Sequence, residues 1–251
     1  MPGSAMSPPP GAQAALRAVR LLKLFTPSRR SLTLTEVARL AGLKKSTAHR
    51  LLRALQSEGL VSHSNGNGTY SLGPSLMALG VQALMCDELR RRARPMLKQL
   101  AQRSGETATL EVPVDDSMLI LDEVTGEHVV GAAANIGTRW PIHATSTGKA
   151  FMAFDASGLE RLGADLPPLT NRTLARRDLE RQLEQIRRSG VAEMVDELEE
   201  GFSGVATVLR GAGGDVIGAL SICGPTARFG EPRRAWLSTT LLTAAHNFRP
   251  G

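Results

Sequence analysis

The sequence is poor in cysteine and in aromatic residues, and it lacks long apolar runs. Its two cysteines, Cys86 and Cys223, are too far apart for a CxxC site and do not suggest the disulfide framework of a small secreted protein. No apolar stretch approaches the roughly 20 residues that a bilayer-spanning helix needs. Aromatic residues make up only 4% of the chain against 42% hydrophobic residues in all. These features favour a cytoplasmic protein with an aliphatic core and no membrane partner.

The spacing typical of a metal site or a catalytic site is also missing. The five histidines are scattered without HxxxH or HxxE spacing, so the sequence predicts no metal ion and no cofactor. His143 with Asp122 or Glu123 could make an acid–base pair, but nothing in the sequence brings them together. The acidic run over residues 193–200 is most simply a solvated helix or loop. We therefore expect a protein without enzymatic activity, and an enzyme is kept as the alternative.

At 251 residues the chain has room for about two domains. Residues 1–11 are rich in Pro, Ser and Gly and lack the apolar segment of a signal peptide, so we expect a disordered tail over residues 1–13. The first helix is expected from Ala15 to Phe25, with Val19 and Leu22 among its buried residues and Pro27 as its stop.

The segment from Thr33 to Gly73 has the pattern of a helix–turn–helix followed by a hairpin. Residues 34–42 read as a short helix, with Thr35 as a candidate N-cap and Gly42 as the turn residue. Residues 43–55 read as a second helix whose leucines share one side. The Gly/Asn turn at 64–68 then joins two short strands. This order predicts a winged helix that binds double-stranded DNA.

The second helix carries hydroxyls and cations suited to base edges and phosphates in a major groove. The candidate DNA-binding residues are Lys44, Lys45, Ser46, Thr47, His49, Arg50 and Arg53, with Arg17 of the first helix and Asn65 and Asn67 of the wing turn. Charge agrees with this placement. Residues 1–75 contain ten Lys and Arg against two Asp and Glu, a net charge of +8, while the remainder has a net charge of −2. A concentrated basic region attracts a phosphate backbone.

Residues 74–103 connect the winged helix to the rest of the chain, and we expect a linker helix over 76–103. Its apolar stripe needs a partner, for which a second copy of the chain is the leading candidate because DNA readers commonly match two-fold half-sites. Pro95 should mark a break or a helix start. The Arg-rich run over residues 90–94 is either a solvated helix end or a second DNA contact.

From Glu106 the pattern changes to α+β. A mixed sheet with helices on one side is expected. Strands are predicted over residues 107–112, 118–124 and 129–133, and a hairpin over 204–209 and 216–222. Helices are predicted over 159–162, 173–188 and 236–248. Such an arrangement suits a ligand pocket, although a fold alone does not identify a function.

Four separated motifs, in this order, carry a family resemblance. They are Ala41-Gly42-Leu43-Lys44-Lys45-Ser46-Thr47-Ala48-His49-Arg50-Leu51-Leu52, Tyr70-Ser71-Leu72-Gly73, the segment from Gly137 to Ala150, and Gly218-Ala219-Leu220-Ser221-Ile222-Cys223-Gly224-Pro225. From about Leu16 to Phe248 the chain resembles the IclR-type bacterial transcription regulators. The resemblance implies an N-terminal winged helix, a linker helix and a C-terminal GAF-like effector domain. It also implies homodimers, often paired into tetramers, and a small organic ligand.

The Ser146-Thr147-Gly148-Lys149 segment invites comparison with a phosphate-binding P-loop. That motif needs Gly five residues before the Gly-Lys pair and Ser or Thr after it, and those positions hold His143 and Ala150 here. The resemblance implies instead that the backbone amides of Ser146 and Thr147 face an effector carboxylate, with a structural helix cap as the alternative.

The resemblance places the far side of the pocket at Met194, Gly204, Ser221 and Cys223. Met194 stands where an Asp can occur and Gly204 where a Cys often does, so the pocket should be larger and more apolar than in relatives that bind small polar acids. The expected effector is therefore a small organic acid, possibly aromatic, with an apolar body.

We therefore expect a ligand-responsive DNA-binding regulator, either a repressor or an activator. Its predicted domains are the tail at 1–13, the winged helix–turn–helix at 14–75, the linker helix at 76–103, and an effector-binding and oligomerisation domain at 104–251. An enzyme or a ligand-independent architectural DNA binder is the alternative, although the large C-terminal region exceeds what dimerisation alone requires.

Overall fold

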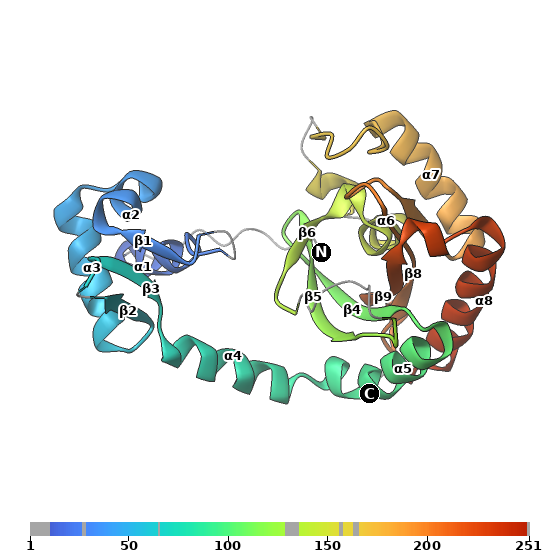
Figure 1. The fold of residues 1–251 in the computed structure, drawn as a ribbon, viewed down its shortest axis with the longest axis horizontal. Helices are drawn as coiled ribbons and strands as arrows, with labels where there is room; N and C mark the ends of the chain where they lie inside the picture. Colours follow the sequence, from blue (N-terminus) through green and yellow to red (C-terminus); the bar gives the residue numbers. More distant parts are fainter. Residues whose placement is uncertain are drawn as a thin grey trace. The chain divides into compact units, whose positions relative to one another are not determined.

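The computed structural model describes residues 11–26, 29–64, 66–128, 136–155, 158–162 and 166–249. Tertiary contacts divide the chain into two compact units, Met1–Cys86 and Asp87–Gly251, which are described separately (Figure 1). The expected tail up to residue 10, Pro27, Asn65 and the strand expected over residues 129–133 lie outside the described residues.

The N-terminal unit is a winged helix, as the sequence predicted. Its elements are α1 (Gln13–Leu22), β1 (Ser31–Thr33), α2 (Leu34–Ala41), α3 (Lys45–Ser57), β2 (Val61–Ser64), β3 (Thr69–Leu72) and α4 (Pro74–Cys86). The three strands form an antiparallel sheet in the order β1-β3-β2, in which the sequence had missed β1. The wing is the β2–β3 hairpin.

Helix α2 begins at Leu34, as predicted, but its N-cap is not the expected residue. Thr33, not Thr35, is its N-cap, because Thr33 has extended backbone and its Oγ1 accepts a hydrogen bond from the Glu36 amide at 3.3 Å. The Glu36 carboxylate accepts in return from the Thr33 amide at 2.8 Å, which completes a capping box. Thr35 lies inside the first turn. Gly42 ends the helix with φ +63°, a conformation that favours glycine, as predicted.

A single aliphatic cluster holds the N-terminal unit together. Leu21 of α1, Val37 of α2 and Leu52 of α3 are fully buried in it. The prediction for α1 was partly wrong. The helix ends at Leu22, and Val19 is 51% exposed while Leu21 takes the buried position.

The expected single linker helix is two helices, α4 and α5 (Glu88–Ser104). Asp87 separates them because its Oδ1 accepts a hydrogen bond from the Arg90 amide at 2.7 Å and caps α5. Pro95 lies inside α5 and marks neither a break nor a start, contrary to the prediction. Helix α5 belongs to the C-terminal unit, where Leu97 and Leu100 are buried.

The C-terminal unit is built around one sheet of six strands. After α5 its elements are β4 (Thr107–Val114), β5 (Ser117–Val124), β6 (Arg139–Pro141), η1 (Ile142–Ala144), α6 (Ser146–Phe154), η2 (Leu159–Arg161), α7 (Arg176–Ser189), β7 (Ala192–Val195), β8 (Phe202–Arg210), β9 (Val216–Pro225), η3 (Thr226–Arg228) and α8 (Glu231–Asn247). The strand order is β6-β5-β4-β9-β8-β7. The β8–β9 hairpin was predicted, whereas the pairing of β4 with β9 joins segments far apart in the sequence.

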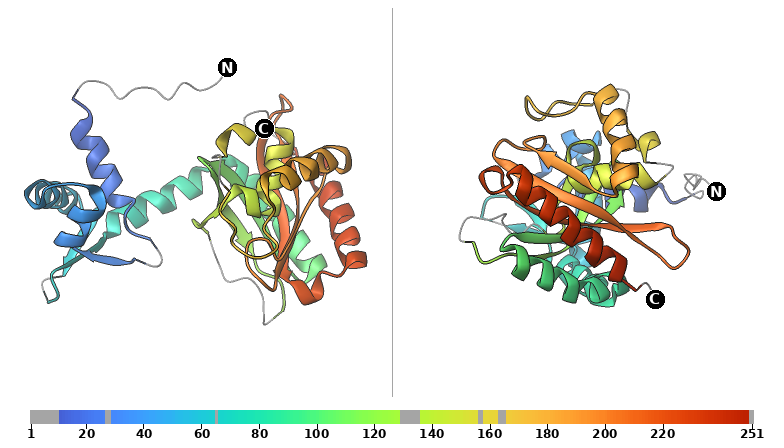
Figure 2. Two further views of the ribbon diagram at one scale, coloured as in Figure 1. Left: turned by 90° about the horizontal axis from the view of Figure 1, so that it is seen from above. Right: turned by 90° about the vertical axis from the view of Figure 1, so that its right-hand side faces the viewer.

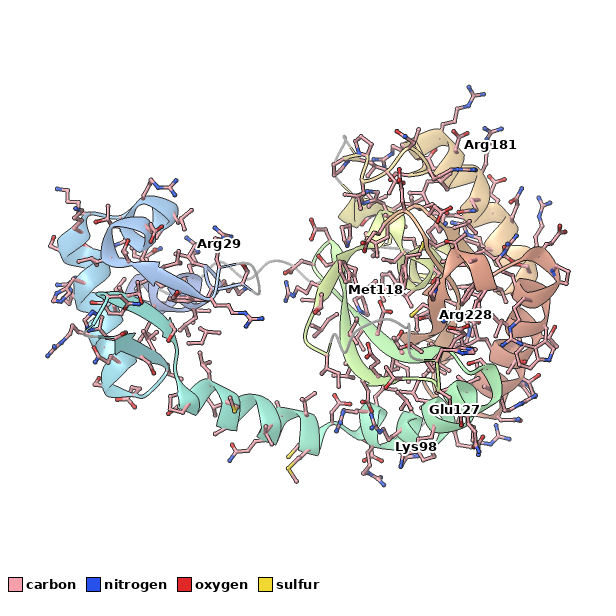
Figure 3. All side chains as sticks on the ribbon, in the orientation of Figure 1. Arg29, Lys98, Met118, Glu127, Arg181 and Arg228 are labelled. Carbon is pink, nitrogen blue, oxygen red and sulfur yellow. The ribbon has the colours of Figure 1, made fainter. Side chains whose placement is uncertain are left out.

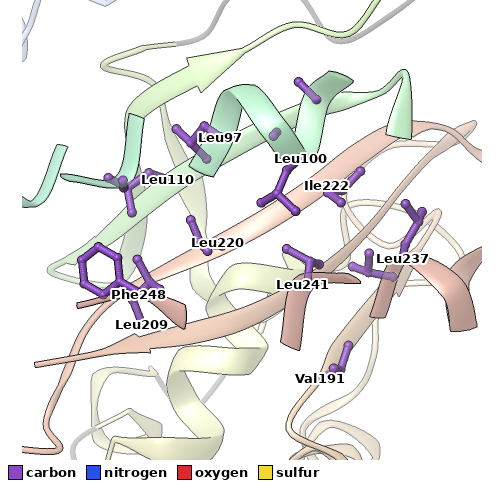
Figure 4. Close-up of a cluster of buried hydrophobic side chains, with 14 of the residues drawn as sticks. Leu97, Leu100, Leu110, Val191, Leu209, Leu220, Ile222, Leu237, Leu241 and Phe248 are labelled. Atoms are coloured by element: carbon purple, nitrogen blue, oxygen red, sulfur yellow. The ribbon is translucent and has the colours of Figure 1, made fainter. Parts of the chain in front are cut away.

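Helices cover both faces of this sheet, not one face as expected (Figure 2). Helices α5 and α8 pack on one face over a cluster that includes Leu97, Leu220 and Leu241 (Figure 4). Helices α6 and α7 pack on the other, over a second cluster that contains Met118 (Figure 3). Every strand pairing within the described residues is antiparallel, so the sheet is not mixed in direction. The α+β class itself is confirmed.

The remaining helices depart from prediction mainly at their ends. Helix α7 begins at Arg176 and not at Thr173, while α8 begins at Glu231, five residues before the predicted start. Residues 159–161 form a short 3-10 turn. None of the described helices combines the length and apolar character needed to cross a bilayer.

Candidate nucleic-acid interface and ligand cavity

Helix α3 has two opposite faces, one apolar and one polar. The buried residues are Ala48, Leu51, Leu52 and Leu55. The exposed residues two positions away are Ser46, His49, Arg50 and Arg53. Both sets have the same spacing, and an offset of two residues is about 200° around an α-helix. The leucines therefore fix the helix in the core and leave the polar stripe on the surface.

The other predicted DNA contacts on the helices also lie at the surface. Lys44 and Lys45 are exposed at the start of α3, Thr47 is half-buried, and Arg17 is exposed on α1. Lys44 occupies the N-cap position without a side-chain cap, so helix α3 starts two residues later than expected.

Asn67 is exposed in the wing turn, but part of its side chain has a structural partner. Its Oδ1 accepts hydrogen bonds from the Thr69 amide at 3.2 Å and the Thr69 hydroxyl at 2.7 Å. The Asn67 oxygen therefore holds the turn, and its amide NH2 is the group available for a phosphate. Asn65, the other predicted DNA contact of the wing, lies outside the described residues.

A cavity of about 390 Å³ lies in the C-terminal unit, between the sheet and the start of α6. Five of the six predicted effector residues line it: Ser146, Thr147, Met194, Ser221 and Cys223. Its apolar walls include Ile120 of β5 and Trp140 of β6, and the turn from Leu198 to Phe202 closes one side. A drug-sized or smaller ligand fits a cavity of this volume.

Gly204 is the sixth predicted residue, and it does not line the cavity. A Cβ built on Gly204 would lie 3.2 Å from Ser146 Oγ and 3.3 Å from Cys223 Cβ. The room left by this glycine is therefore occupied by Ser146 and Cys223, so its missing side chain does not enlarge the pocket. Met194 pairs with Gly204 across β7–β8 and is buried against the cavity.

The start of α6 presents backbone donors to the cavity. Thr145 is the N-cap, and its Oγ1 accepts a hydrogen bond from the Gly148 amide at 3.0 Å. Among the described residues none accepts from the amides of Ser146 or Thr147, which belong to the first turn, where helices leave donors unpaired. Ser146 Oγ, on a buried residue, also has no described partner. Gly148 is required because a Cβ there would overlap the Ile142 carbonyl.

A buried carboxyl group, Glu111 of β4, lies beside these donors. Its Oε2 accepts a hydrogen bond from the Thr147 hydroxyl at 2.6 Å, and its Oε1 accepts from the Thr109 hydroxyl at 2.9 Å. Burial raises the pKa of Glu111 above its ordinary value, and the two hydroxyl donors oppose that rise. Glu123 of β5 also lines the cavity, and Glu199 and Glu200 lie at its rim.

Lys149, the lysine of the segment that was compared with a P-loop, is not available to a phosphate. Lys149 is fully buried, and its Nζ donates to Glu197 Oε1 at 2.6 Å. Burial lowers the pKa of Lys149 and raises the pKa of Glu197, while each partner opposes the shift of the other. The pair ties α6 to the turn after β7. The acidic run over 193–200 is thus not a simply solvated segment, because it contributes this buried partner.

Two residues of the alternative acid–base pair, His143 and Asp122, have other partners in the structure. The His143 ring lies 3.1 Å from the Pro167 carbonyl oxygen, while Asp122 binds Arg90 and Arg94 of α5. The arginine-rich run is therefore neither a free helix end nor a free DNA-binding patch at these two positions. No group of three or more potential metal ligands occurs within the described ranges.

Sequence reasoning missed Thr109, Glu111, Glu123 and Trp140 as lining residues. A signal was present for two of them. Thr107, Thr109 and Glu111 alternate with Ala108 and Leu110 along β4, and all are buried. A polar set that alternates within a wholly buried strand indicates a polar interior on one sheet face.

Comparison with known proteins agrees with both halves of the structure. Residues 14–64 match the model of the IclR helix-turn-helix domain, and residues 81–249 match that of the bacterial transcriptional regulator IclR C-terminal domain. The glycerol operon regulatory protein of Streptomyces coelicolor is 35% identical over 86% of each chain.

Two solved structures extend the similarity. An IclR transcriptional regulator from Alicyclobacillus acidocaldarius is 28% identical, with a TM-score of 0.82 over 92% of this chain and 95% of that one. An IclR homologue from Microbacterium hydrocarbonoxydans, complexed with 4-hydroxybenzoate, is 28% identical, with a TM-score of 0.76 over 93% and 99% of the two chains.

The relatives are named as transcriptional regulators, so the expectation of a regulator in place of an enzyme is confirmed. The winged helix and the C-terminal unit with its cavity are, in this chain, the parts of a DNA-binding protein that responds to a ligand. The chain belongs to the IclR family of bacterial transcriptional regulators.

Proposed function

We propose that α3 binds operator DNA in the major groove and that the wing contacts the phosphate backbone beside it. The proposed contacts are Lys44, Lys45, Ser46, Thr47, His49, Arg50 and Arg53 of the α3 region, Arg17 of α1, and Asn65 and Asn67 of the wing. The observation that supports this best is the opposite placement of the polar and the buried stripe on α3. Hydroxyls and cations along such a stripe suit base edges and phosphates.

The effector in this proposal is a small organic acid with an aromatic or alkyl body, bound in the cavity of the C-terminal unit. The free amides of Ser146 and Thr147 suit its carboxylate, and Ile120, Trp140 and Met194 suit its apolar body. The family relative complexed with 4-hydroxybenzoate supports an aromatic acid of this size. The cavity also favours a ligand-responsive regulator over an architectural DNA binder, which needs none.

The same proposal makes the protein a homodimer through α4, with a tetramer formed as a dimer of dimers. None of the α4 residues is buried in the single chain, and the segment Pro74–Cys86 contains no charged residue. Met77 and Met85 are about three-quarters exposed. An apolar surface of this kind favours association with a second copy. Two copies would present two α3 helices to the half-sites of an operator.

Ligand binding would then change the spacing of the two winged helices and so the affinity for the operator. A protein that binds the chromosome of a bacterium works in the cytoplasm. The family membership defines a regulator, which is either a repressor or an activator.

Arg50→Ala tests the DNA part of the proposal, with Arg177→Ala as a matched control on exposed α7. In a gel-shift titration with the promoter fragment beside the gene, Arg50→Ala should weaken specific binding by about 1–3 kcal/mol, or roughly 5- to 150-fold. Arg177→Ala should bind like the wild type. Equal affinity of Arg50→Ala and the wild type would exclude α3 as the recognition helix.

A further inference from the structure

The acid-binding end of the cavity already contains an acid. Glu111 is only 6% exposed, and its Oε2 is bound to the hydroxyl of Thr147 at 2.6 Å. The amide of that same Thr147 is one of the two free donors at the start of α6. A ligand carboxylate bound to the Thr147 amide would therefore lie next to the Glu111 carboxyl group, which is bound to the hydroxyl of the same residue.

The charges around Glu111 offer no compensation for a second anion. No Lys, Arg or His is among the described residues that line the cavity. The titratable groups that face it are Glu123 from β5, Cys223 from β9, and Glu199 and Glu200 from the turn after β7. Among the causes that raise the pKa of the Cys223 thiol, burial comes first, followed by the negative charges of Glu111 and Glu123.

Four basic side chains on neighbouring elements have other partners. Lys149 of α6 binds Glu197. Arg90 and Arg94 of α5 bind Asp122, on the sheet face opposite the cavity. The His143 ring, just before α6, lies against the Pro167 carbonyl. None of these side chains reaches the oxygens of Glu111.

Two carboxylates held side by side in a largely buried site repel each other strongly when both are ionised, because no basic side chain among the described lining residues lies beside them. One of them must take a proton. Glu111 is more easily protonated than the ligand carboxylate, because burial already favours the neutral form of Glu111. The amides of Ser146 and Thr147, in contrast, stabilise the ligand's negative charge.

We propose that the cavity binds its acid effector together with one proton taken from solvent, and that Glu111 holds this proton next to the bound carboxylate. The inference rests on the acid effector proposed above and specifies how pH regulates the binding of that effector. No covalent bond to the ligand forms or breaks. The protein would then respond to the concentration of the acid and to pH together, and a given acid concentration would occupy more sites at low pH than at high pH.

The sign of the pH dependence follows from linkage. Below the pKa of Glu111 in the free protein, the proton is already present and affinity does not change with pH. Between that pKa and the higher pKa of Glu111 in the complex, affinity falls by about tenfold for each pH unit. The loss occurs as pH rises, because the complex binds more protons than the free protein.

Isothermal titration calorimetry of the full-length protein tests this with benzoate, 4-hydroxybenzoate and phenylacetate as probes. Titrations in buffers with different ionisation enthalpies measure the protons taken up for each ligand bound. We expect about one proton per ligand within the window in which affinity falls. Benzamide, which has the shape of benzoate without its charge, should bind with no proton uptake and no pH dependence. An uptake near zero for every acid that binds would overturn the proposal.

Two variants identify the group that holds the proton. Glu111→Gln keeps the size of the side chain and cannot titrate, so it should bind the acid with constant affinity from about pH 6 to pH 8 and without proton uptake. Glu184→Gln, at an exposed position of α7 that does not line the cavity, is the matched control and should retain the uptake. Uptake that persists in Glu111→Gln would refute the assignment to Glu111.

The outcomes also separate this inference from the proposed function. If none of the three acids binds at any pH in that range, the acid effector is wrong and the inference fails with it. If an acid binds with no proton uptake, the acid effector stands and only the role of Glu111 is wrong. Wild-type titrations alone give both answers, so neither depends on how well Glu111→Gln folds.

Discussion

Replacing Lys149 by Met should destabilise the C-terminal unit strongly, because it leaves a buried carboxylate without its partner. Lys149 is fully buried, and Glu197, its partner at 2.6 Å, is 6% exposed. Removal of one member of a buried ion pair costs about 3–5 kcal/mol. That is a large fraction of the roughly 5–15 kcal/mol by which a domain of ordinary stability resists unfolding. We expect a loss of this size near neutral pH.

The loss should depend on pH in a defined direction. Burial already raises the pKa of Glu197, and Lys149 opposes that rise. Without Lys149 the pKa of Glu197 in the folded protein rises further, while its value in the unfolded chain stays near the ordinary one. The folded variant therefore binds more protons than the unfolded variant above pH 4–5, and it loses stability as pH rises. The penalty should be smaller near pH 5 than near pH 8.

Urea denaturation followed by tryptophan fluorescence measures this in the full-length protein. Both tryptophans, Trp140 and Trp236, lie in the C-terminal unit, so the signal reports that unit alone. Lys98→Met, an exposed lysine on α5, is the matched control and should change the free energy of unfolding by less than about 0.5 kcal/mol.

The double variant Lys149→Met/Glu197→Met completes the test. Replacing both charges by apolar groups removes the uncompensated carboxylate, so the double variant should be more stable than Lys149→Met alone. If Lys149→Met matched the wild type, or if the second substitution lowered stability further by its full separate cost, the buried pair would not be the source of the effect.

Three other variants test separate parts of the structure. Thr33→Ala removes the cap of α2 and should lower the thermal stability of the N-terminal unit by about 0.5–2 kcal/mol, as measured by circular dichroism; an unchanged melting curve would exclude the Thr33–Glu36 capping box. Met77→Glu with Met85→Glu places charges on exposed α4 and should shift sedimentation from dimer toward monomer, whereas an unchanged dimer would move the interface elsewhere. Met194→Asp adds an anion to the cavity wall and should weaken acid binding at least about tenfold in calorimetry while operator binding remains, and equal acid affinity would show that Met194 does not face the ligand.

The winged helix could be predicted from sequence because its signals are local. Apolar spacing gives the helix faces, Gly42 gives the turn at a positive φ, and the Gly/Asn segment gives the wing. Even there the choice of Thr33 over Thr35 as the cap depended on which residue has extended backbone, and two nearby threonines carry the same chemical signal.

The connection between the units was predicted less well, since its boundaries depend on competition among weak signals. Pro95 suggested a break, but Asp87 caps α5 and the packing of Leu97 and Leu100 carries the helix through the proline. Arg90 and Arg94, which the sequence left as solvated or DNA-binding residues, form ion pairs with Asp122 of β5. This contact could not be predicted, because the residues lie far apart in the sequence.

By itself the sequence determined the domain order, the basic winged helix, the family and, through the resemblance, most of the residues that surround the cavity. The tertiary structure decided the charge inside that cavity. Thr109 of β4 meets Ser221 of β9 across the sheet at 2.7 Å between hydroxyl oxygens, and Glu111, on the same strand, accepts a hydrogen bond from Thr147 of α6. A pairing between strands more than 100 residues apart leaves no local pattern. The burial of a charged group, and therefore its protonation, depends on such distant neighbours.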